Sequence, residues 1–219
     1  MVEKNLQTVL NEIKGGNPYG EEVTLVGATK FIPVDIINRA IDAGLKDVSE
    51  NRAQEFKEKY PLVNQPVNYH FIGSLQKNKV KYLIGKCHLI HSVDSLSLLD
   101  EIARQAKNKG TIQNVLLEVN MGVEEQKHGF DLDELEGVLS YAKSVDGVCV
   151  LGLMAMLPAS DDQDFLFELA KKLRSVYDSY KEEYGFKHLS LGMSNDYALC
   201  VKAGSNMIRV GSKIFGKRY

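Results

Sequence analysis

The chain has 219 residues, of which 44% are hydrophobic and 26% charged, and its formal net charge is −2. This balance is typical of a globular protein and provides no overall attraction to nucleic acid or to an acidic membrane. The three cysteines, Cys87, Cys149 and Cys200, form no CxxC pair, so we expect reduced thiols, a cytoplasmic location and neither a disulfide framework nor a metal site. No run of about 18 apolar residues predicts a membrane span.

The predicted elements alternate between strand and helix along the chain. A charged helical pattern over residues 3–14 comes first, and eight apolar, β-branched runs then predict strands. These runs cover residues 23–30, 47–51, 69–74, 88–93, 114–120, 148–156, 188–193 and 207–211. Helical periodicity predicts helices over residues 33–43, 80–84, 95–109, 132–142 and 165–184, several of which are followed by a glycine.

This alternation predicts parallel strands that are joined by helical crossovers. Eight such units close into a (β/α)₈ barrel more naturally than they form an open sheet. A doubly wound open sheet is the alternative, although no GxGxxG follows the first strand. Because no linker interrupts the pattern, we expect residues 1–219 to form a single α/β domain, a TIM barrel whose extra N-terminal helix covers the barrel floor.

Two turns rich in small residues follow the last two predicted strands. The segment LSLGMSND (189–196) places Ser194 and Asn195 where a helix is expected to begin, and IRVGSKIFG (208–216) supplies a turn at Gly211 and Ser212. Paired turns of this kind after strands seven and eight of a barrel commonly bind phosphate. The alternative is that Ser194 only caps a helix and Gly211 only ends a strand.

A lysine and an arginine are expected near the same end of the barrel. Lys30 ends the first strand, and a neutral lysine amine can form a Schiff base with a carbonyl, whereas a solvated lysine is the ordinary alternative. Arg209 points into the barrel mouth, where it needs either a ligand or a carboxylate such as Glu50 or Glu118. A lysine, a phosphate site and a polar group for an aromatic ring together indicate a pocket for pyridoxal 5′-phosphate (PLP).

The chain resembles the PLP homeostasis proteins, which are single-domain relatives of the alanine racemase N-terminal barrel. The resemblance spans nearly the whole chain and rests on six motifs: LVGATKFIP (25–33), VSENRAQEFKEK (48–59), YHFIGSLQKNKVKYL (69–83), LLEVNMGVEEQKHGF (116–130), GLMAM (152–156) and LSLGMSNDYALCVKAGSNMIRVGSKIFG (189–216). It implies that Lys30 forms the Schiff base and that Arg209 faces the pyridine nitrogen. It also implies a phosphate site at Ser194, Gly211 and Ser212, with Asn51 lining the pocket. Arg52, where many relatives carry an aromatic residue, and Ser212, where many carry Thr, depart from the family pattern.

The same resemblance implies a function in intracellular PLP homeostasis, with PLP as the ligand, a monomeric state and apo forms of PLP-dependent enzymes as candidate recipients. An arginine donates to the ring nitrogen and cannot accept its proton, which favours a PLP carrier over an efficient catalyst. A racemase would also need a second acid/base, for which Tyr197 and Tyr219 are weak candidates, and we expect no further domain after Tyr219.

Three alternatives stay open at this point. The first is a PLP-dependent racemase or a related enzyme of low activity. The second is a Schiff-base aldolase or phosphosugar isomerase that uses Lys30 without a cofactor. The third is an interaction protein that uses the basic segment at residues 77–86, although a solvated helix is the simpler interpretation of those lysines. The segment EEQKHGF (124–130) is expected to be an exposed loop.

Overall fold

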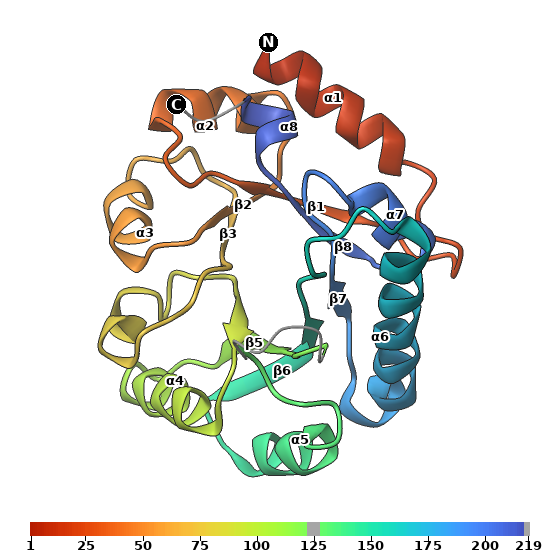
Figure 1. Cartoon of the computed structure of the whole chain (residues 1–219). Coiled ribbons are helices and arrows are strands. Elements are labelled where there is room, and N and C mark those ends of the chain that lie inside the picture. Colours follow the sequence, from red (N-terminus) through yellow and green to blue (C-terminus); the bar gives the residue numbers. More distant parts are fainter. Residues whose placement is uncertain (122–127, 217–219) are drawn as a thin grey trace.

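The strands close into a barrel. The computed structural model describes residues 1–121 and 128–216, and Figure 1 shows its eight parallel strands arranged as a ring inside a layer of helices. The strands follow one another in chain order, and β8 (Met207–Val210) pairs with β1 (Thr24–Ala28) to complete the ring. The predicted (β/α)₈ barrel is therefore confirmed, and the alternative of an open sheet is wrong.

Every predicted strand is present, and most strands end earlier than predicted. The remaining strands are β2 (Asp47–Glu50), β3 (Asn68–Phe71), β4 (Leu89–Val93), β5 (Gln113–Glu118), β6 (Val148–Met154) and β7 (His188–Ser190). The polar residues that were assigned to strand ends, such as Lys30 and Asn51, therefore lie in the loops that follow the strands. In these loops the side chains are free to face the barrel mouth.

The long helices were predicted well, and the short ones were not. The described helices are α1 (Val2–Ile13), α2 (Val34–Asp42), α3 (Ala53–Lys59), the 3₁₀ helix η1 (Lys77–Tyr82), α4 (Leu96–Asn108), α5 (Leu135–Ser144), α6 (Gln163–Tyr184), α7 (Tyr197–Lys202) and α8 (Ser212–Phe215). No helix was predicted at α3 or α8, and α7 begins after the expected Ser194 or Asn195. These helices are too short to show a clear apolar period in the sequence.

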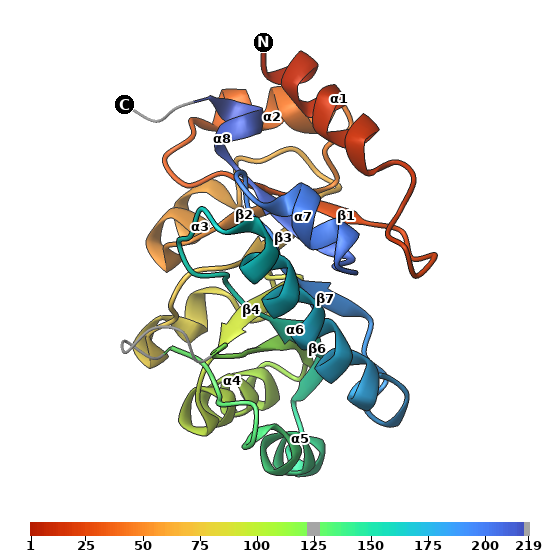
Figure 2. The same ribbon diagram turned by 45° about the vertical axis from the view of Figure 1, so that its right-hand side comes forward.

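The N-terminal helix does not cover the barrel floor as expected. It packs in the outer layer against α2, α7 and α8, as Figures 1 and 2 show from two directions. Its buried stripe consists of Val2, Leu6, Val9 and Ile13, which is the spacing of one helix face. Because α8 has only four residues, the outer layer next to β8 would be incomplete without α1. The N-terminal helix thus covers that part of the barrel wall.

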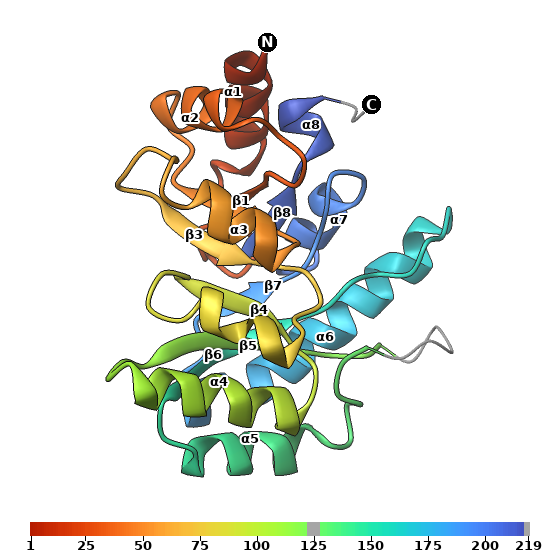
Figure 3. The ribbon, with the colours of Figure 1, turned by 90° about the vertical axis from the view of Figure 1, so that its left-hand side faces the viewer.

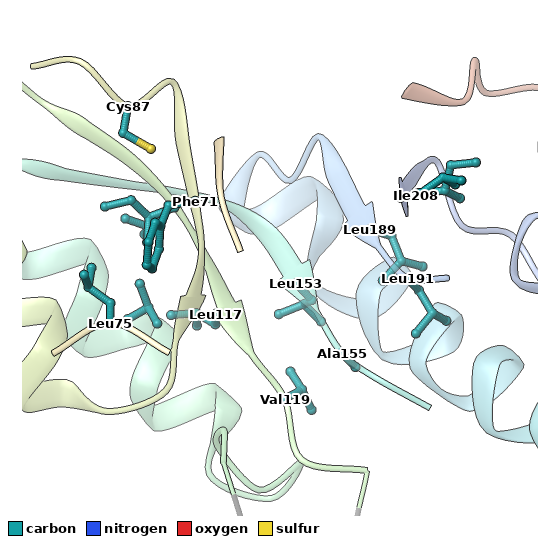
Figure 4. Close-up of a cluster of buried hydrophobic side chains, with 14 of the residues drawn as sticks. Phe71, Leu75, Cys87, Leu117, Val119, Leu153, Ala155, Leu189, Leu191 and Ile208 are labelled. Atoms are coloured by element: carbon teal, nitrogen blue, oxygen red, sulfur yellow. The ribbon is translucent and has the colours of Figure 1, made fainter. Parts of the chain in front are cut away.

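Apolar side chains form two separate clusters. The larger one lies between the strands and the helices, and Figure 4 shows part of it, including Leu117, Leu153 and Leu189 from three consecutive strands. Figure 3 shows α4 and α5 side by side along the outside of this layer. The smaller cluster, formed by Val26, Leu89, Leu116, Met154 and Met207, lies inside the barrel. The barrel interior is therefore only partly apolar.

Cys87 and Cys200 are buried and Cys149 is exposed, and all three are free thiols. Among the described helices, none is both long enough and apolar enough to cross a membrane. Most of the predicted loop at 124–130 and the candidate base Tyr219 lie outside the described residues.

Gly152 in β6 provides a test of the barrel geometry. Its φ is 146°, and a Cβ there would lie 1.9 Å from the carbonyl oxygen of His188 on β7. We expect Gly152→Ala to lower the free energy of unfolding by about 2–4 kcal/mol, because it adds backbone strain and overpacking at the β6–β7 ladder. Chemical denaturation measures this change.

Gly137→Ala is the matched control, because a Cβ on this glycine of α5 meets no atom within 4 Å. It should raise the free energy of unfolding by about 0.5–1 kcal/mol through helix propensity. Equal stability of the two variants would contradict the close approach of β6 and β7.

Candidate functional site

A cavity of about 870 Å³ lies at the carboxyl ends of the strands. Its wall includes every residue that the sequence predicted for a cofactor site: Lys30, Asn51, Ser194, Arg209, Gly211 and Ser212. The loop after β6 supplies further wall residues that the sequence analysis missed, among them Leu157, Ser160 and Asp161. The small and polar residues of PASDDQ (158–163) were the available signal for that loop.

Lys30 stands in the turn directly after β1 and is half-buried in the cavity wall. Its Nζ lies 5.1 Å from the centre of the Phe31 ring, and the guanidinium of Arg52 lies 4.8 Å from the same ring. The Phe31 ring therefore lies within cation–π distance of both cationic groups. Arg52, the departure from the family pattern, thus lies beside the turn that carries Lys30.

Asn51 is held by the close approach of the neighbouring loop. A Cβ on Gly73, in the loop after β3, would lie 2.1 Å from the carbonyl oxygen of Asn51. Only glycine leaves room for this contact. The backbone of the loop after β3 therefore packs directly on Asn51 and fixes its position in the cavity wall.

The two small-residue turns are joined by a hydrogen bond, because the amide N–H of Gly211 donates to Ser194 Oγ at 3.1 Å. Ser194 does not cap a helix, since Asp196 occupies the N-cap position of α7. Within the described part of the chain, the amide N–H groups of Ser194, Asn195 and Ser212 have no acceptor. The turns therefore present free donors at one edge of the cavity, which is what a phosphate group requires.

Arg209 is 5% exposed and reaches the cavity from β8. Its Nη1 donates to Ser190 O at 2.9 Å and to Ser190 Oγ at 2.7 Å, and its Nη2 donates to Ala155 O at 2.9 Å. A guanidinium has five N–H groups, so two of them have no partner among the described residues and can serve a ligand. Burial lowers the pKa of Arg209 from its ordinary value, and an arginine nevertheless stays protonated.

The expected ion pair of Arg209 is not found among the described residues. Glu50 instead pairs with Lys59 at 2.8 Å on the other side of the sheet. Glu118 lies close enough to interact with Arg209 electrostatically but does not form a salt bridge with it. The neighbouring carbonyl groups orient Arg209 in place of a carboxylate.

A series of hydrogen bonds crosses the barrel interior beneath Arg209, and the sequence analysis did not find it. Ser190 Oγ, which accepts from Arg209, lies 3.0 Å from His91 Nδ1. His91 Nε2 lies 2.9 Å from His70 Nδ1, and His70 Nε2 lies 3.1 Å from Asp47 Oδ1. We call these five residues the interior network. They come from β2, β3, β4, β7 and β8, so the network spans the barrel.

The two ends of the interior network determine where its protons lie. Burial would raise the pKa of the Asp47 carboxyl, but the hydrogen bonds from His70 and Asn68 and the electrostatic effects of His70 and His88 together outweigh it. The pKa is therefore lowered, and Asp47 is an ionised acceptor. Burial, together with the nearby His70 and Arg209, holds the pKa of His91 well below its usual range, so His91 is neutral. When His70 is neutral, it donates from Nε2 to Asp47 and accepts at Nδ1 from His91. In each hydrogen bond of the network, the donor is then the residue nearer to Arg209 and the acceptor is the residue nearer to Asp47.

Tyr197 and the basic segment at residues 77–86 lie outside the cavity wall. The hydroxyl of Tyr197 donates to Glu12 in a partly buried contact, and Tyr197 does not line the cavity. The basic segment forms η1, where Lys79 and Lys81 lie near the Tyr82 ring. Within residues 1–121 and 128–216, no group of three or more His, Cys, Asp or Glu side chains is arranged to hold a metal ion.

The interior network predicts the tautomer of His91. With neutral His70, His91 donates from Nε2 to His70 and accepts at Nδ1 from Ser190 Oγ, so its single proton lies on Nε2. We expect nitrogen NMR to show the neutral imidazole of His91 protonated at Nε2. His128, which is exposed and pairs with Asp94, is the internal control. A proton on Nδ1 of His91 would contradict this order of donors and acceptors.

Comparison with known proteins relates this barrel to a family. The model of the alanine racemase N-terminal domain matches residues 34–219. The pyridoxal phosphate homeostasis protein of Aquifex aeolicus is 41% identical over 197 residues, which cover 89% of this chain and 86% of that protein. The corresponding protein of Escherichia coli K12 is 32% identical over 203 residues, which cover 90% of this chain and 87% of that protein.

Solved structures agree with this assignment. PipY of Synechococcus elongatus superimposes with TM-scores of 0.89 without PLP and 0.87 with PLP bound, at 28% and 27% identity, and 99% of this chain and 100% of PipY are covered. Alanine racemase of Clostridium difficile superimposes with a TM-score of 0.79 at 16% identity, covering 98% of this chain and 57% of that chain, which shows a shared fold alone. The chain therefore belongs to the pyridoxal phosphate homeostasis protein family, whose barrel is of the alanine racemase N-terminal type.

Proposed function

We propose that this chain binds PLP in the cavity, holds it as a Schiff base on Lys30 and in this way takes part in intracellular PLP homeostasis. One observation carries the proposal: a lysine, two joined turns with free amide donors and a buried arginine face the same cavity. A relative of similar fold, PipY, has been solved with PLP bound. Apo forms of PLP-dependent enzymes would be the recipients of the cofactor.

The donor groups of the cavity fit the chemistry of PLP. The amide N–H groups of Ser194, Asn195 and Ser212 would hold the phosphate, and the two remaining N–H groups of Arg209 would face the ring nitrogen. Asn51 would line the pocket beside the ring. When bound, PLP supplies an aldehyde carbon for a lysine amine and a ring that withdraws electrons when its nitrogen is protonated.

Arg209 favours a carrier over a racemase. An arginine donates to the ring nitrogen and does not accept a proton, so it leaves the ring a weak electron acceptor. Racemisation also needs a second acid/base, and the described wall of the cavity contains no Tyr, His or Cys. The carboxylates in that wall are Asp161 and Asp196, and Asp196 already accepts a hydrogen bond from the amide of Met193. A PLP-dependent racemase therefore remains the second candidate.

Attachment at Lys30 is tested by the visible spectrum. We expect the purified protein, mixed with PLP, to gain a visible absorption band, and borohydride reduction followed by mass spectrometry to place the cofactor on Lys30. Lys30→Ala should lose the band. Lys77→Ala, in the exposed basic segment, is the matched control and should keep it.

Each alternative function has a different outcome in this experiment. A colourless wild-type protein would refute the proposal. Borohydride trapping of a sugar phosphate without colour would favour a cofactor-independent aldolase or isomerase. Exchange of the α-proton of amino acids with deuterium at turnover-like rates would favour the racemase. A function that survives Lys30→Ala and fails when Lys77, Lys79 and Lys81 are replaced would favour an interaction protein.

The assignment of Arg209 is tested by replacing it with an acid. In Arg209→Glu the new carboxylate can keep the ring nitrogen protonated, so we expect the absorption maximum of the bound cofactor to shift while circular dichroism remains that of the folded barrel. Arg39→Glu, in the exposed part of α2, is the control and should leave the spectrum unchanged. An unchanged spectrum in Arg209→Glu would remove Arg209 from the site.

A further inference from the structure

Helix α3 presents an acid and a base, one turn apart, to the turn that carries Lys30. Glu55 and Lys59 stand at i and i+4, and their side chains are only 17% and 13% exposed. This pair belongs to the motif VSENRAQEFKEK, of which the cofactor site uses only Asn51. Surface ion pairs at this spacing are common, but this one is largely buried and contacts backbone groups.

All three N–H donors of the Lys59 ammonium form hydrogen bonds within one small region. Its Nζ donates to Thr29 O at 2.9 Å, to Glu50 Oε1 at 2.8 Å and to Glu55 Oε2 at 2.9 Å. An ammonium group has three N–H donors, so none remains for another partner. Thr29 is the residue immediately before Lys30. The ammonium of Lys59 therefore ties the end of β1 to α3.

Glu50 strengthens this tie from the adjacent strand. Its side chain is fully buried, and its Oε1 accepts from Thr29 Oγ1 at 2.7 Å. Burial raises the pKa of the Glu50 carboxyl, against the opposing effects of Lys59 and Thr29. Thr29 is thus held through its carbonyl group and through its hydroxyl.

Glu55 holds the residue on the other side of Lys30. The amide N–H of Phe31 donates to Glu55 Oε2 at 2.9 Å. Phe31 has a φ of 63°, in the left-handed region that residues other than glycine rarely adopt. Such a conformation persists only where its surroundings enforce it. The hydrogen bond from Phe31 to Glu55 is a contact of this kind.

We propose that Glu55 and Lys59 are positioning residues for Lys30. They fix Thr29 and Phe31, the two neighbours of Lys30, so that the lysine amine projects into the cavity and not into solvent. This inference rests on the proposed function of Lys30. In the condensation the amine nitrogen forms a bond to the aldehyde carbon of PLP, and the aldehyde oxygen leaves as water with the two hydrogens of the amine.

The proposal predicts that reaction and binding respond differently to Glu55→Ala. The rate of Schiff-base formation with PLP should fall about 10- to 100-fold, because the amine is no longer held at reacting distance. The affinity for pyridoxine 5′-phosphate, which has an alcohol in place of the aldehyde, should stay within about twofold, since it depends on the turns and on Arg209. Stopped-flow absorbance and calorimetry measure the two quantities.

A second measurement needs no bound ligand. The amide hydrogen of Phe31 should exchange with solvent faster in Glu55→Ala than in the wild type, because its acceptor is lost. Glu55→Gln keeps an oxygen that can accept this hydrogen bond and should recover most of the reaction rate. Glu58→Ala, an exposed position on the same helix, is the matched control and should match the wild type in every measurement.

Several results would overturn the proposal. One is an unchanged rate in Glu55→Ala despite faster exchange at Phe31, and another is a Glu55→Gln variant no faster than Glu55→Ala. A parallel fall in rate and in pyridoxine 5′-phosphate affinity would mean that Glu55 supports the whole cavity. A wild-type protein that does not react with PLP would instead refute the proposed function, and amide exchange would still decide whether Glu55 holds the turn at Phe31.

Discussion

The ladder between β1 and β8 is the constraint on which the site depends. It pairs Val26 with Arg209 and Gly27 with Val210, which joins the first and last strands of the barrel. Lys30, in the turn after β1, and the Gly211 turn, after β8, thereby line one cavity. Without closure, an amine and an arginine far apart in the sequence would have no common environment. The site therefore depends on the barrel topology, which brings its residues together, as well as on the loops that carry them.

The sequence was sufficient for the fold and for placing the named site residues in the cavity wall, but not for the part of the wall that the loop after β6 supplies. Apolar, β-branched runs and amphipathic helices such as α6 identify barrel units, and the rule that strand ends form the site then selects Lys30, Asn51 and Arg209. The sequence was not sufficient for the hydrogen bonds between elements. The local sequence places Ser194 at the start of a helix and allows it to be a helix cap, whereas its partner is the amide of Gly211, which follows a different strand.

The groups that the sequence analysis missed share one physical origin. Glu55 and Lys59 lie on a seven-residue helix that shows no clear apolar period, and their partners are backbone groups after β1. The sequence analysis assigns no role to His91, which contacts His70 across the barrel interior from β4. What His91 does contact, His70 and Ser190, depends on which strands neighbour one another inside the barrel. Such pairings cannot be read from a single segment.

The interior network also connects two environments that are otherwise isolated from each other. Asp47 lies at the amino-terminal end of β2 and is partly open to solvent, while Arg209 borders the cavity at the opposite end of the barrel. Thermodynamic linkage is reciprocal. If protonation of the histidines changes the affinity of Arg209 for a ligand, ligand binding must change the free energy of protonation by the same amount. The heat of ligand binding would then depend on the buffer, because binding in the cavity would exchange protons with solvent at the other end of the barrel.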